Sequence, residues 1–591
     1  MTVSATGALV HARRRASPLA VARGVWEAPL AAHFAVLLTA MIGFAAFIGV
    51  HTTFTDDEAN VVLQAQAIEG GHWVLPVPFP RVDPTGRYYA TENVSLTPAG
   101  VAPLAKHLIY TSLVAGALRL AGPAGAAALS IAGCLVAALC SAWLARLYAP
   151  KVERAAFWAT GLASPLFFYG FVDTGQTIGA AGCAIAIALT IVFLRRGGIR
   201  SLLSVAVAMA VAATAREETV IYGIAAGIAL VMVGVTHRRT FRPMTVRLIA
   251  AGLVLPAAGI GGRLADVLLG HRALGAGQAF SQEASSLLGG NSWLGQLRGF
   301  VIAAAGPGHG PDPFAHAAPV IFLVTVTAFA ALGYGAALLR AKRVGPVAVA
   351  LFLLATGLLV ARAAYEANSP VAGILPAFPL LWVAIWALGR TDVRRPETAW
   401  VLLTTLIFSA GVGVSVYSDG GGLQWGGRYF LVALPAALPA LLEALRRWSI
   451  PGHTRWGTAA CLAVSSLAVT WQMGATLAAT HRAGSIALAE IAQAADTAGA
   501  GDGGSPVVLT SSVAVGMLWS AEDRYRVLRP PATEMGSLGE KLRAAGVVRL
   551  VLATQQTTAD EKALRGSYRV LSTLPHSPGL RDFTVAVLAA D

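Results

Sequence analysis

Three consecutive acidic residues, Asp56, Asp57 and Glu58, stand a few residues after an apolar run at positions 30–50. A helix rises about 1.5 Å per residue, so roughly 20 apolar residues cross the hydrocarbon core and place these acids at a membrane boundary. A carboxylate there can stay ionised and accept the proton of a hydroxyl group. The alternative is that the acids cap the next helix, where its dipole favours negative charge by about 0.3–1 kcal/mol. The two roles are compatible.

Cationic residues stand where other apolar runs begin or end, and they suit a phosphate group: Lys106, His107, Arg216 and Arg428. An Arg within an apolar run is costly and usually faces a cavity or a partner, which makes Arg216 the most informative. Its alternative is a structural ion pair with Glu217 or Glu218. Arg428 follows two glycines that would let a ligand approach closely, or it simply starts a helix. The first two residues either contact the anion or mark the membrane interface.

Further candidates are an acid, two aromatic residues and two histidines. Asp173 follows the end of an apolar run, where it either contacts a substrate or caps a helix. Trp425 and Tyr429 either stack on a sugar ring or belong to the aromatic belt at the membrane boundary, which is the more usual role. His309 and His316 lie in a Gly/Pro-rich segment and are ligands for a metal or phosphate only if partners lie nearby.

The composition predicts a polytopic membrane protein. The 591 residues are 56% hydrophobic and 13% charged, and their mean hydropathy is +0.64. Apolar runs recur from residue 30 to residue 479, and some are short, so we expect an all-α body of about 11 to 13 transmembrane helices. All four cysteines lie in such runs, where Cys behaves as a small hydrophobe. We therefore expect neither a disulfide nor a zinc site.

Lys and Arg indicate the orientation, because they are enriched in short cytoplasmic loops. The basic loops agree with one another: 11–15, 195–200, 237–247, 340–343, 390–395 and 446–455. They place the N-terminus in the cytoplasm and the Asp56 loop outside. The formal net charge of +14 is explained by these loops, so we do not expect nucleic-acid binding. Residues 106–146 could form two helices broken at Gly122-Pro123, although the flanking loops require one crossing.

The chain divides into a cytoplasmic tail at 1–29, a transmembrane domain at 30–479 with external loops at 51–106 and 264–316, and an extracytoplasmic domain at 480–591. In the last part the hydrophobic spans stop and short β-rich runs alternate with helical ones, which predicts a small α/β domain. It has no Gly-rich phosphate loop, so we expect it to contact an acceptor or add stability.

Secondary structure within this last part is predicted from local patterns. Strands are expected at 506–510, 547–553 and 583–588. A helix is expected at 538–545, with Gly546 as its C-cap.

Several motifs together resemble a known family. They are the acidic pair and small-residue helix at 57–70, Lys106-His107-Leu108-Ile109-Tyr110, Ser164-Pro165 followed by Asp173, Arg216-Glu217, and the glycine-rich 421–429 before Leu434-Pro435. Residues 34–445 resemble the GT-C fold of polyprenyl-phosphate-dependent glycosyltransferases. They are similar to the protein mannosyltransferase and lipid A aminoarabinose transferase branch, in particular to actinobacterial members.

This resemblance implies transfer of a sugar from a polyprenyl phosphate to a hydroxyl group of a glycan, lipid or protein at the outer face of the cell membrane. It implies Asp57 as the general base, with Glu58 orienting it or helping to hold a divalent cation. Because Asp56 precedes Asp57, the base assignment is open by one residue. The donor phosphate would meet Arg428, Arg216, Lys106 and His107, whereas Asp173, Trp425 and Tyr429 would contact substrate.

Two other classes of protein compete with this interpretation. A secondary transporter would place charges near the bilayer midplane within inverted repeats, and no such internal symmetry is visible here. A non-catalytic scaffold for envelope assembly would tolerate neutral residues at Asp57 and Arg428. The sequence shows no nucleotide-binding fingerprint, which favours a lipid-linked donor over a nucleotide sugar.

Overall fold

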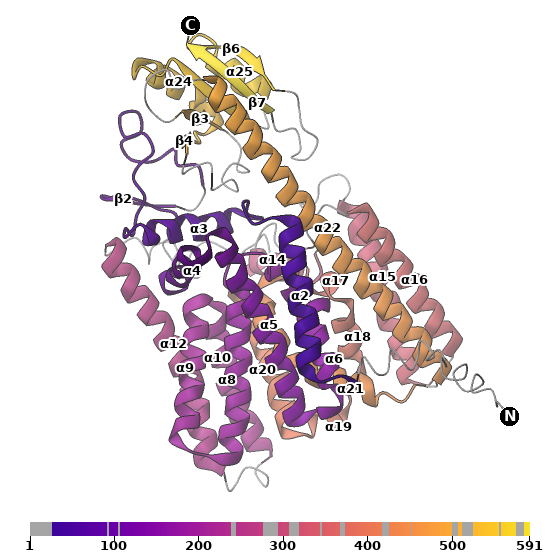
Figure 1. The fold of residues 1–591 in the computed structure, drawn as a ribbon. Coiled ribbons are helices and arrows are strands. Elements are labelled where there is room, and N and C mark those ends of the chain that lie inside the picture. The colour runs from indigo at the N-terminus through magenta and orange to yellow at the C-terminus, as the bar shows by residue number, and fades with distance from the viewer. Residues whose placement is uncertain are drawn as a thin grey trace, which may run out of the picture.

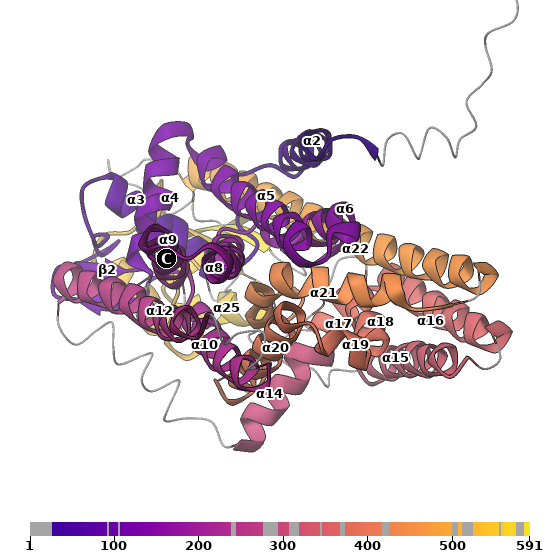
Figure 2. The ribbon, with the colours of Figure 1, turned by 90° about the horizontal axis from the view of Figure 1, so that it is seen from below.

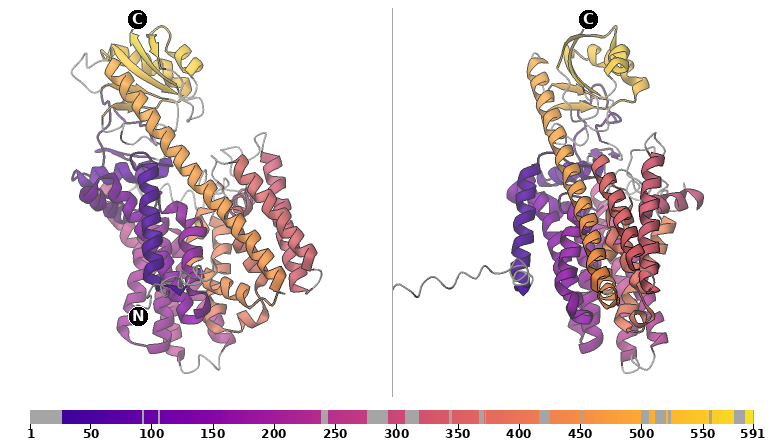
Figure 3. Two further views of the ribbon diagram at one scale, coloured as in Figure 1. Left: turned by 45° about the vertical axis from the view of Figure 1, so that its right-hand side comes forward. Right: turned by 90° about the vertical axis from the view of Figure 1, so that its right-hand side faces the viewer.

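The structure, a computed structural model, is a helical body with a small α/β domain at one end (Figure 1). It describes residues 27–590 except 92–93, 105–106, 238–243, 276–292, 307–317, 343–344, 367–370, 372, 416–424, 451, 499–505, 511–519, 521–523, 555–556 and 575–583. Helix α22 (Gly452–Ala498) runs without a break from the body into the α/β domain (Figures 1 and 3). The domain boundary that we predicted at residues 479–480 lies inside this helix.

Ten of the described helical segments are long and apolar enough to cross a membrane. They are α2 (Leu30–Ile48), α5 (Pro123–Tyr148), α8 (Gln176–Arg196), α10 (Glu218–Thr236), α12 (Thr245–Leu274), α15 (Ala318–Arg340), α16 (Gly345–Tyr365), α20 (Pro396–Ser415), the segment Arg428–Arg447 made of η4 (Arg428–Ala433) and α21 (Leu434–Arg447), and α22. Two shorter apolar helices are α4 (Leu108–Ala121) and α9 (Ile199–Ala215). The expected multi-pass helical body is confirmed.

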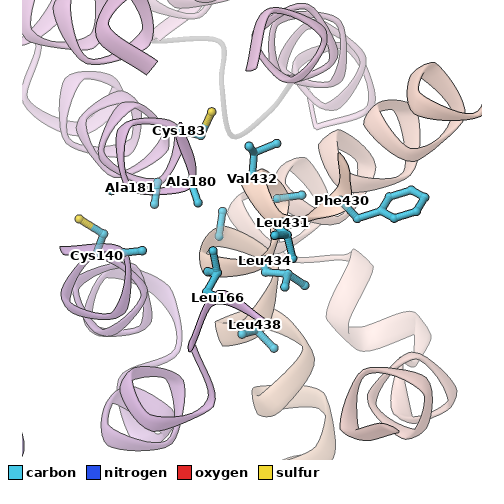
Figure 4. Close-up of a cluster of buried hydrophobic side chains, with 14 of the residues drawn as sticks. Cys140, Leu166, Ala180, Ala181, Cys183, Phe430, Leu431, Val432, Leu434 and Leu438 are labelled. Atoms are coloured by element: carbon cyan, nitrogen blue, oxygen red, sulfur yellow. The ribbon is translucent and has the colours of Figure 1, made fainter. Parts of the chain in front are cut away.

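Small residues allow the central helices to pack closely. A Cβ atom added at Gly182 of α8 would lie 2.7 Å from the Cβ of Ala212 on α9, so only glycine permits this approach. The apolar core includes Cys140 and Cys183, together with side chains of η4 and α21 such as Leu431 (Figure 4). The described cysteines are thus buried packing residues, as their apolar surroundings predicted.

Several apolar stretches are broken into short helical pieces. Residues 153–169 form α6 (Glu153–Trp158), a π-helical turn η2 (Ala159–Ala163) and α7 (Leu166–Tyr169), with the short η1 (Pro150–Val152) before them. The break falls at Ser164-Pro165, because proline has no N–H group to continue the helix. Similarly, α17 (Ile374–Ala377) and α18 (Pro379–Ala387) meet at a proline, and α14 (Trp293–Ala305) stands alone.

The break expected at Gly122-Pro123 is present, because Gly122 adopts a φ of 58° between α4 and α5. Further along the chain, α12 continues to Leu274, so the loop that we predicted to start at residue 264 begins later. Two charged residues in this part of α12 form an ion pair and neutralise each other, since Arg263 Nη1 lies 2.6 Å from Asp266 Oδ2. Helix α12 is therefore longer than its hydropathy suggested.

The three acids and the described basic loops lie at opposite ends of the helical body. The acidic residues start α3 (Asp56–Glu69), which lies across one end beside α4 and the hairpin of β1 (Ser95–Thr97) and β2 (Gly100–Ala102) (Figure 1). At the opposite end, Arg195 pairs with Glu397 at 3.0 Å, and Arg447 pairs with Asp392 of α19 (Arg390–Val393) at 3.1 Å. The basic loops in the described part of the chain thus gather away from the acids.

Seen along the helix axes, the body separates into two groups of helices (Figure 2). One contains α5, α8, α9, α10 and α12, and the other contains α15, α16, α18 and α22. Helix α2 lies at the edge of the first group, and α20 and α21 lie between the two. The indole N–H of Trp400 on α20 donates to the carbonyl oxygen of Ala226 on α10 at 2.9 Å, which fixes one of these contacts.

The C-terminal domain has a five-stranded sheet in the order β4-β3-β5-β7-β6. Its elements are β3 (Val507–Leu509), β4 (Arg526–Leu528), η6 (Ala532–Glu534), α24 (Met535–Ala544), β5 (Arg549–Thr554), α25 (Thr557–Leu564), β6 (Tyr568–Thr573) and β7 (Thr584–Ala590). Strands β4, β3 and β5 are parallel, whereas β7 runs antiparallel to β5 and β6. Ile491 near the end of α22 packs on one face, against Val508 and Val551. The expected small α/β domain is confirmed.

The segment between α3 and α4 is joined to the C-terminal domain. Phe79, Val82 and Tyr88 share a hydrophobic core with α24 and the sheet. The hydroxyl group of Tyr88 donates to Glu534 Oε2 at 2.7 Å, and Arg87 Nη2 lies 2.5 Å from Glu534 Oε1. The C-terminal domain therefore lies at the same end of the body as the three acids.

Candidate active site

Asp57 and Arg428, which are 371 positions apart, meet as an ion pair at the end of the body that carries α3. Arg428 Nη1 donates to Asp57 Oδ2 at 2.7 Å. The Arg428 side chain is only 13% exposed, whereas the Asp57 side chain is 40% exposed. The structure thus brings the predicted base and a predicted phosphate ligand into direct contact, at the end of the helical body that faces the C-terminal domain (Figure 1).

Local backbone structure holds each partner in place. The hydroxyl oxygen of Thr55 caps α3 by accepting from the backbone N–H of Glu58 at 3.2 Å, so the capping role expected for this segment also involves a threonine. At Gly427, φ is 57°, and an added Cβ atom would lie 2.3 Å from the carbonyl oxygen of Ala303. Only glycine fits there, which explains why Arg428 follows a glycine.

Tyr429 orients the guanidinium group of Arg428. Arg428 Nη2 donates to the Tyr429 hydroxyl oxygen at 3.2 Å, and the guanidinium carbon lies 5.0 Å from the centre of the Tyr429 ring. Among the described residues, no hydrogen-bond partner contacts the buried Nε atom of Arg428. Tyr429 therefore belongs to this site because it orients Arg428. This role requires no contact between its hydroxyl group and a sugar.

Glu58 points to a different partner from its neighbour in the sequence. Its Oε2 atom accepts from the backbone N–H of Phe54 at 2.6 Å, and its Oε1 atom accepts from the backbone N–H of Asp173 at 2.9 Å. The hydroxyl group of Ser130 in turn donates to Asp173 Oδ1 at 2.6 Å. Glu58 thus ties the start of α3 to the loop before α8, and its hydrogen bonds do not orient Asp57 directly.

The buried carboxyl groups of Glu58 and Asp173 titrate as a pair. Burial, and then the Asp173 carboxylate, raise the pKa of Glu58 to about 8. Burial raises the pKa of Asp173 to about 6, and the hydrogen bond from Ser130 opposes this shift. Near neutral pH the pair therefore retains a proton, because burial and mutual repulsion make it costly for both carboxyl groups to ionise.

A small hollow lies beside this acid pair. Its polar lining comes from Glu58, Asp173, Thr52, Thr53 and His481, and its apolar walls come from α2, α4 and α5. The imidazole Nδ1 of His481 lies 3.0 Å from the hydroxyl oxygen of Thr52, so α22 helps to close one side. Helix α3 thus directs Asp57 toward Arg428 and Glu58 toward this hollow.

Arg216 is held in a buried ion pair, as the structural alternative for this residue predicted. Its Nε and Nη2 atoms donate to the two carboxylate oxygens of Glu218 at 3.0 and 2.6 Å. Its Nη1 atom donates to the carbonyl oxygen of Thr174 at 3.3 Å, close to the start of α8. Glu218 therefore occupies the guanidinium N–H donors that would otherwise be available to bind a phosphate.

The remaining predicted residues do not gather around Arg428. His107, at a φ of 59°, lies 3.3 Å from Arg263 Nη1 and belongs to a cluster with Asp266. Trp425 is fully buried and stacks on Phe168 with ring centres 5.3 Å apart, which is a packing role rather than sugar stacking or an aromatic belt. Asp56 is half-buried in the first turn of α3. Three predicted residues lie outside the described part of the chain: Lys106, His309 and His316.

The sequence did not point to Ser130 and Thr174, which contact two of the candidate residues. Ser130 lies within α5 and holds Asp173, whereas Thr174 supplies a carbonyl oxygen to Arg216. A hydroxyl residue in an apolar run is a weak signal, because most such residues bond to their own helix. The pairing of Glu218 with Arg216 was one of the stated alternatives.

The ligand set for a divalent cation is incomplete. No group of three or more His, Cys, Asp or Glu side chains is placed to hold a metal ion within the described residues. Glu58 accepts two backbone hydrogen bonds, and Asp57 faces a guanidinium group, which would repel a cation. The described residues alone therefore do not fit the divalent cation that the family resemblance left open.

Comparisons with known proteins find a distant likeness to a solved structure. No family model and no curated protein matches this chain. Among solved structures, it is similar to the archaeal oligosaccharyltransferase AglB from Archaeoglobus fulgidus, in complex with an inhibitory peptide and a dolichol-phosphate. The two share 12% identical residues with a TM-score of 0.47, and the match covers 94% of this chain and 74% of that chain. The roles of the site residues consequently rest on the geometry described above.

Proposed function

We propose that this chain is a GT-C-like membrane glycosyltransferase that moves a sugar from a polyprenyl-phosphate donor to a hydroxyl group of a glycan, lipid or protein. The observation that carries this proposal is the contact of 2.7 Å between Asp57 Oδ2 and Arg428 Nη1. Sugar transfer to an alcohol needs a carboxylate for the hydroxyl proton and a cation for the departing phosphate. These two groups lie next to each other at the boundary that both substrates would reach.

In the proposed reaction, the acceptor oxygen forms a bond to the anomeric carbon of the sugar. The bond between that carbon and the phosphate oxygen breaks, and its electron pair stays with the phosphate. Asp57 takes the proton of the acceptor hydroxyl group, and Arg428 stabilises the charge on the phosphate. Because Glu218 occupies two donor atoms of Arg216, we assign the principal phosphate contact to Arg428 and a supporting role to Arg216.

The topology belongs to the same proposal. We place the N-terminus and the basic loops in the cytoplasm, and α3 and the C-terminal domain outside the cell membrane. Support comes from the position of the described basic loops, at the end of the body opposite α3, and from the positive-inside tendency of membrane proteins. A lipid-linked donor suits this side, because nucleotide sugars are cytoplasmic.

The geometry gives less support to the two competing functions. A transporter would hold its ionisable residues near the bilayer midplane, whereas Asp57, Glu58 and Asp173 lie in segments between candidate spans. A scaffold protein would not need a buried Arg428 that contacts α3, nor the preceding Gly427 that this backbone conformation requires. Both alternatives predict that neutral substitutions in the site leave sugar transfer unaffected, so activity measurements separate them from the proposal.

The experiment that tests the phosphate contact is Arg428→Ala in purified protein, with turnover measured against the concentration of a polyprenyl-phosphate sugar. We expect kcat/KM for the donor to fall by about 10²-fold or more, since an oriented cation in a site of low dielectric is lost. Arg87→Ala is the matched control, because Arg87 also forms an ion pair near the outer end but is 61% exposed. An unaltered response to donor in Arg428→Ala would contradict the proposed role of this residue.

A further inference from the structure

The ion pair between Asp57 and Arg428 places the proposed base in contact with the group that should bind the donor. A carboxylate that accepts a hydrogen bond from a guanidinium group is a weaker proton acceptor, because the ion pair stabilises its charged form. The same guanidinium group cannot give its best geometry to a phosphate while it holds Asp57. The two functions assigned to this site therefore compete in the structure as it stands.

We propose that the donor phosphate displaces Asp57 from Arg428, so that binding of the lipid-linked phosphate releases the base for the acceptor hydroxyl group. This inference rests on the proposed function and adds an order of events to it. Before the donor binds, Asp57 neutralises Arg428. After the donor binds, the phosphate neutralises Arg428, and the carboxylate oxygens of Asp57 face the acceptor.

The exposure of the two side chains determines which one moves. Arg428 is 13% exposed and is fixed through its Nη2 atom and its ring contact with Tyr429. Asp57 is 40% exposed, so water can solvate its carboxylate when it leaves the guanidinium group. Moving Asp57 is therefore cheaper than moving Arg428, and the phosphate should come to Arg428 rather than the reverse.

A phosphate can engage more donor atoms of Arg428 than Asp57 does. A guanidinium group carries five N–H donors in one plane, and Arg428 contacts Asp57 through Nη1 and Tyr429 through Nη2. A phosphate offers several oxygens and can accept from both Nη atoms of Arg428, including the Nη1 atom that holds Asp57, so it can outcompete a single carboxylate oxygen.

The neighbouring arginine does not relieve this competition. Arg216 is committed through two donor atoms to Glu218 and through a third to the carbonyl oxygen of Thr174. Its pair with Glu218 is almost fully buried, with exposures of 9% and 6%, so breaking it is far more costly than breaking the pair of Asp57. The exposed ion pair is thus the one suited to exchange.

The test is direct binding of farnesyl phosphate to the purified full-length chain in detergent, measured by calorimetry, with farnesol as the uncharged reference. If Asp57 competes with phosphate, Asp57→Asn should bind farnesyl phosphate about three to ten times more tightly than the wild type, with farnesol binding unchanged. Asp57→Glu should resemble the wild type because it keeps the competing charge. Asp57→Ser gives a second neutral variant should the asparagine protein fold poorly.

Glu69→Gln is the matched control for charge. It removes one negative charge from the exposed far end of α3 without a contact to Arg428, so affinity for farnesyl phosphate should stay at the wild-type value. Unchanged or weaker binding by both Asp57→Asn and Asp57→Ser would overturn the exchange, while the proposed function stands if Arg428→Ala weakens binding. Equal binding of farnesyl phosphate and farnesol by the wild type would overturn the phosphate site itself.

Discussion

The wild-type protein should lose stability as the pH rises from about 5 to about 8. Glu58→Gln should abolish most of this pH-dependent loss. Burial and the Asp173 carboxylate raise the pKa of Glu58 to about 8 in the folded protein, from 4.5 for an exposed glutamate. Between these two values the folded state binds a proton that the unfolded state has released. Each rise in pH therefore favours unfolding, and the stability present below pH 4.5 is lost as pH approaches 8.

The size of this effect follows from the shift in pKa. One pKa unit corresponds to about 1.36 kcal/mol, so the full shift of Glu58 corresponds to roughly 5 kcal/mol. Glu58 shares its proton with Asp173, so we expect the wild type to lose a few kcal/mol relative to the variant. Glutamine keeps one acceptor oxygen but leaves one of two backbone N–H groups unpaired, which costs about 1–3 kcal/mol at every pH.

The two stability curves should therefore converge or cross. Thermal unfolding in detergent, followed by tryptophan fluorescence from pH 5 to pH 9, should show Glu58→Gln below the wild type at pH 5 and level with it or above it near pH 9. Glu69→Gln, at the exposed far end of α3, is the control and should run parallel to the wild type. A constant difference between wild type and Glu58→Gln over the whole range would refute a proton held at Glu58.

Two further substitutions test the neighbourhood of the site. Glu218→Ala should destabilise the protein by about 3–5 kcal/mol, because it leaves Arg216 buried and unpaired. The control Glu217→Ala, at a half-buried position, should cost less than about 1 kcal/mol. Equal shifts of the two variants in thermal unfolding would contradict the buried pair. Trp425→Phe should change sugar transfer by less than about tenfold, because phenylalanine keeps the stack on Phe168. A much larger loss of turnover with unchanged folding would instead place the indole against the sugar.

The helical body and the outline of the C-terminal domain follow from local patterns in the sequence. Apolar runs predicted the membrane helices, and the strands at 507–509, 549–554 and 584–590 lie close to their predicted positions. Gly546 adopts a φ of 84° after α24, as a C-cap glycine should. Strands β4 and β6 were missed, because β4 is only three residues long and the residues of β6 after Tyr568 are exposed, so neither shows a strong pattern.

The contacts that define the candidate site could not be read in this way. Asp57 and Arg428 were both proposed, but their pairing joins residues 371 positions apart and depends on how α3 lies over the helical body. The division of labour between Asp57 and Glu58 is also invisible in the sequence, since adjacent residues on a helix point about 100° apart toward different partners. Trp425 looked suited to a sugar because burial in the fold is not a property of its local sequence.

The central claim is that Asp57 takes the acceptor proton beside an arginine that binds the donor phosphate. The most direct test compares sugar transfer by the wild type and by Asp57→Asn, at equal amounts of folded protein, from a polyprenyl-phosphate sugar to cell-envelope acceptors. The account predicts a loss of about 10²-fold to 10⁴-fold in turnover, with the melting temperature nearly unchanged because the lost ion pair is partly exposed. Full turnover by Asp57→Asn would contradict it.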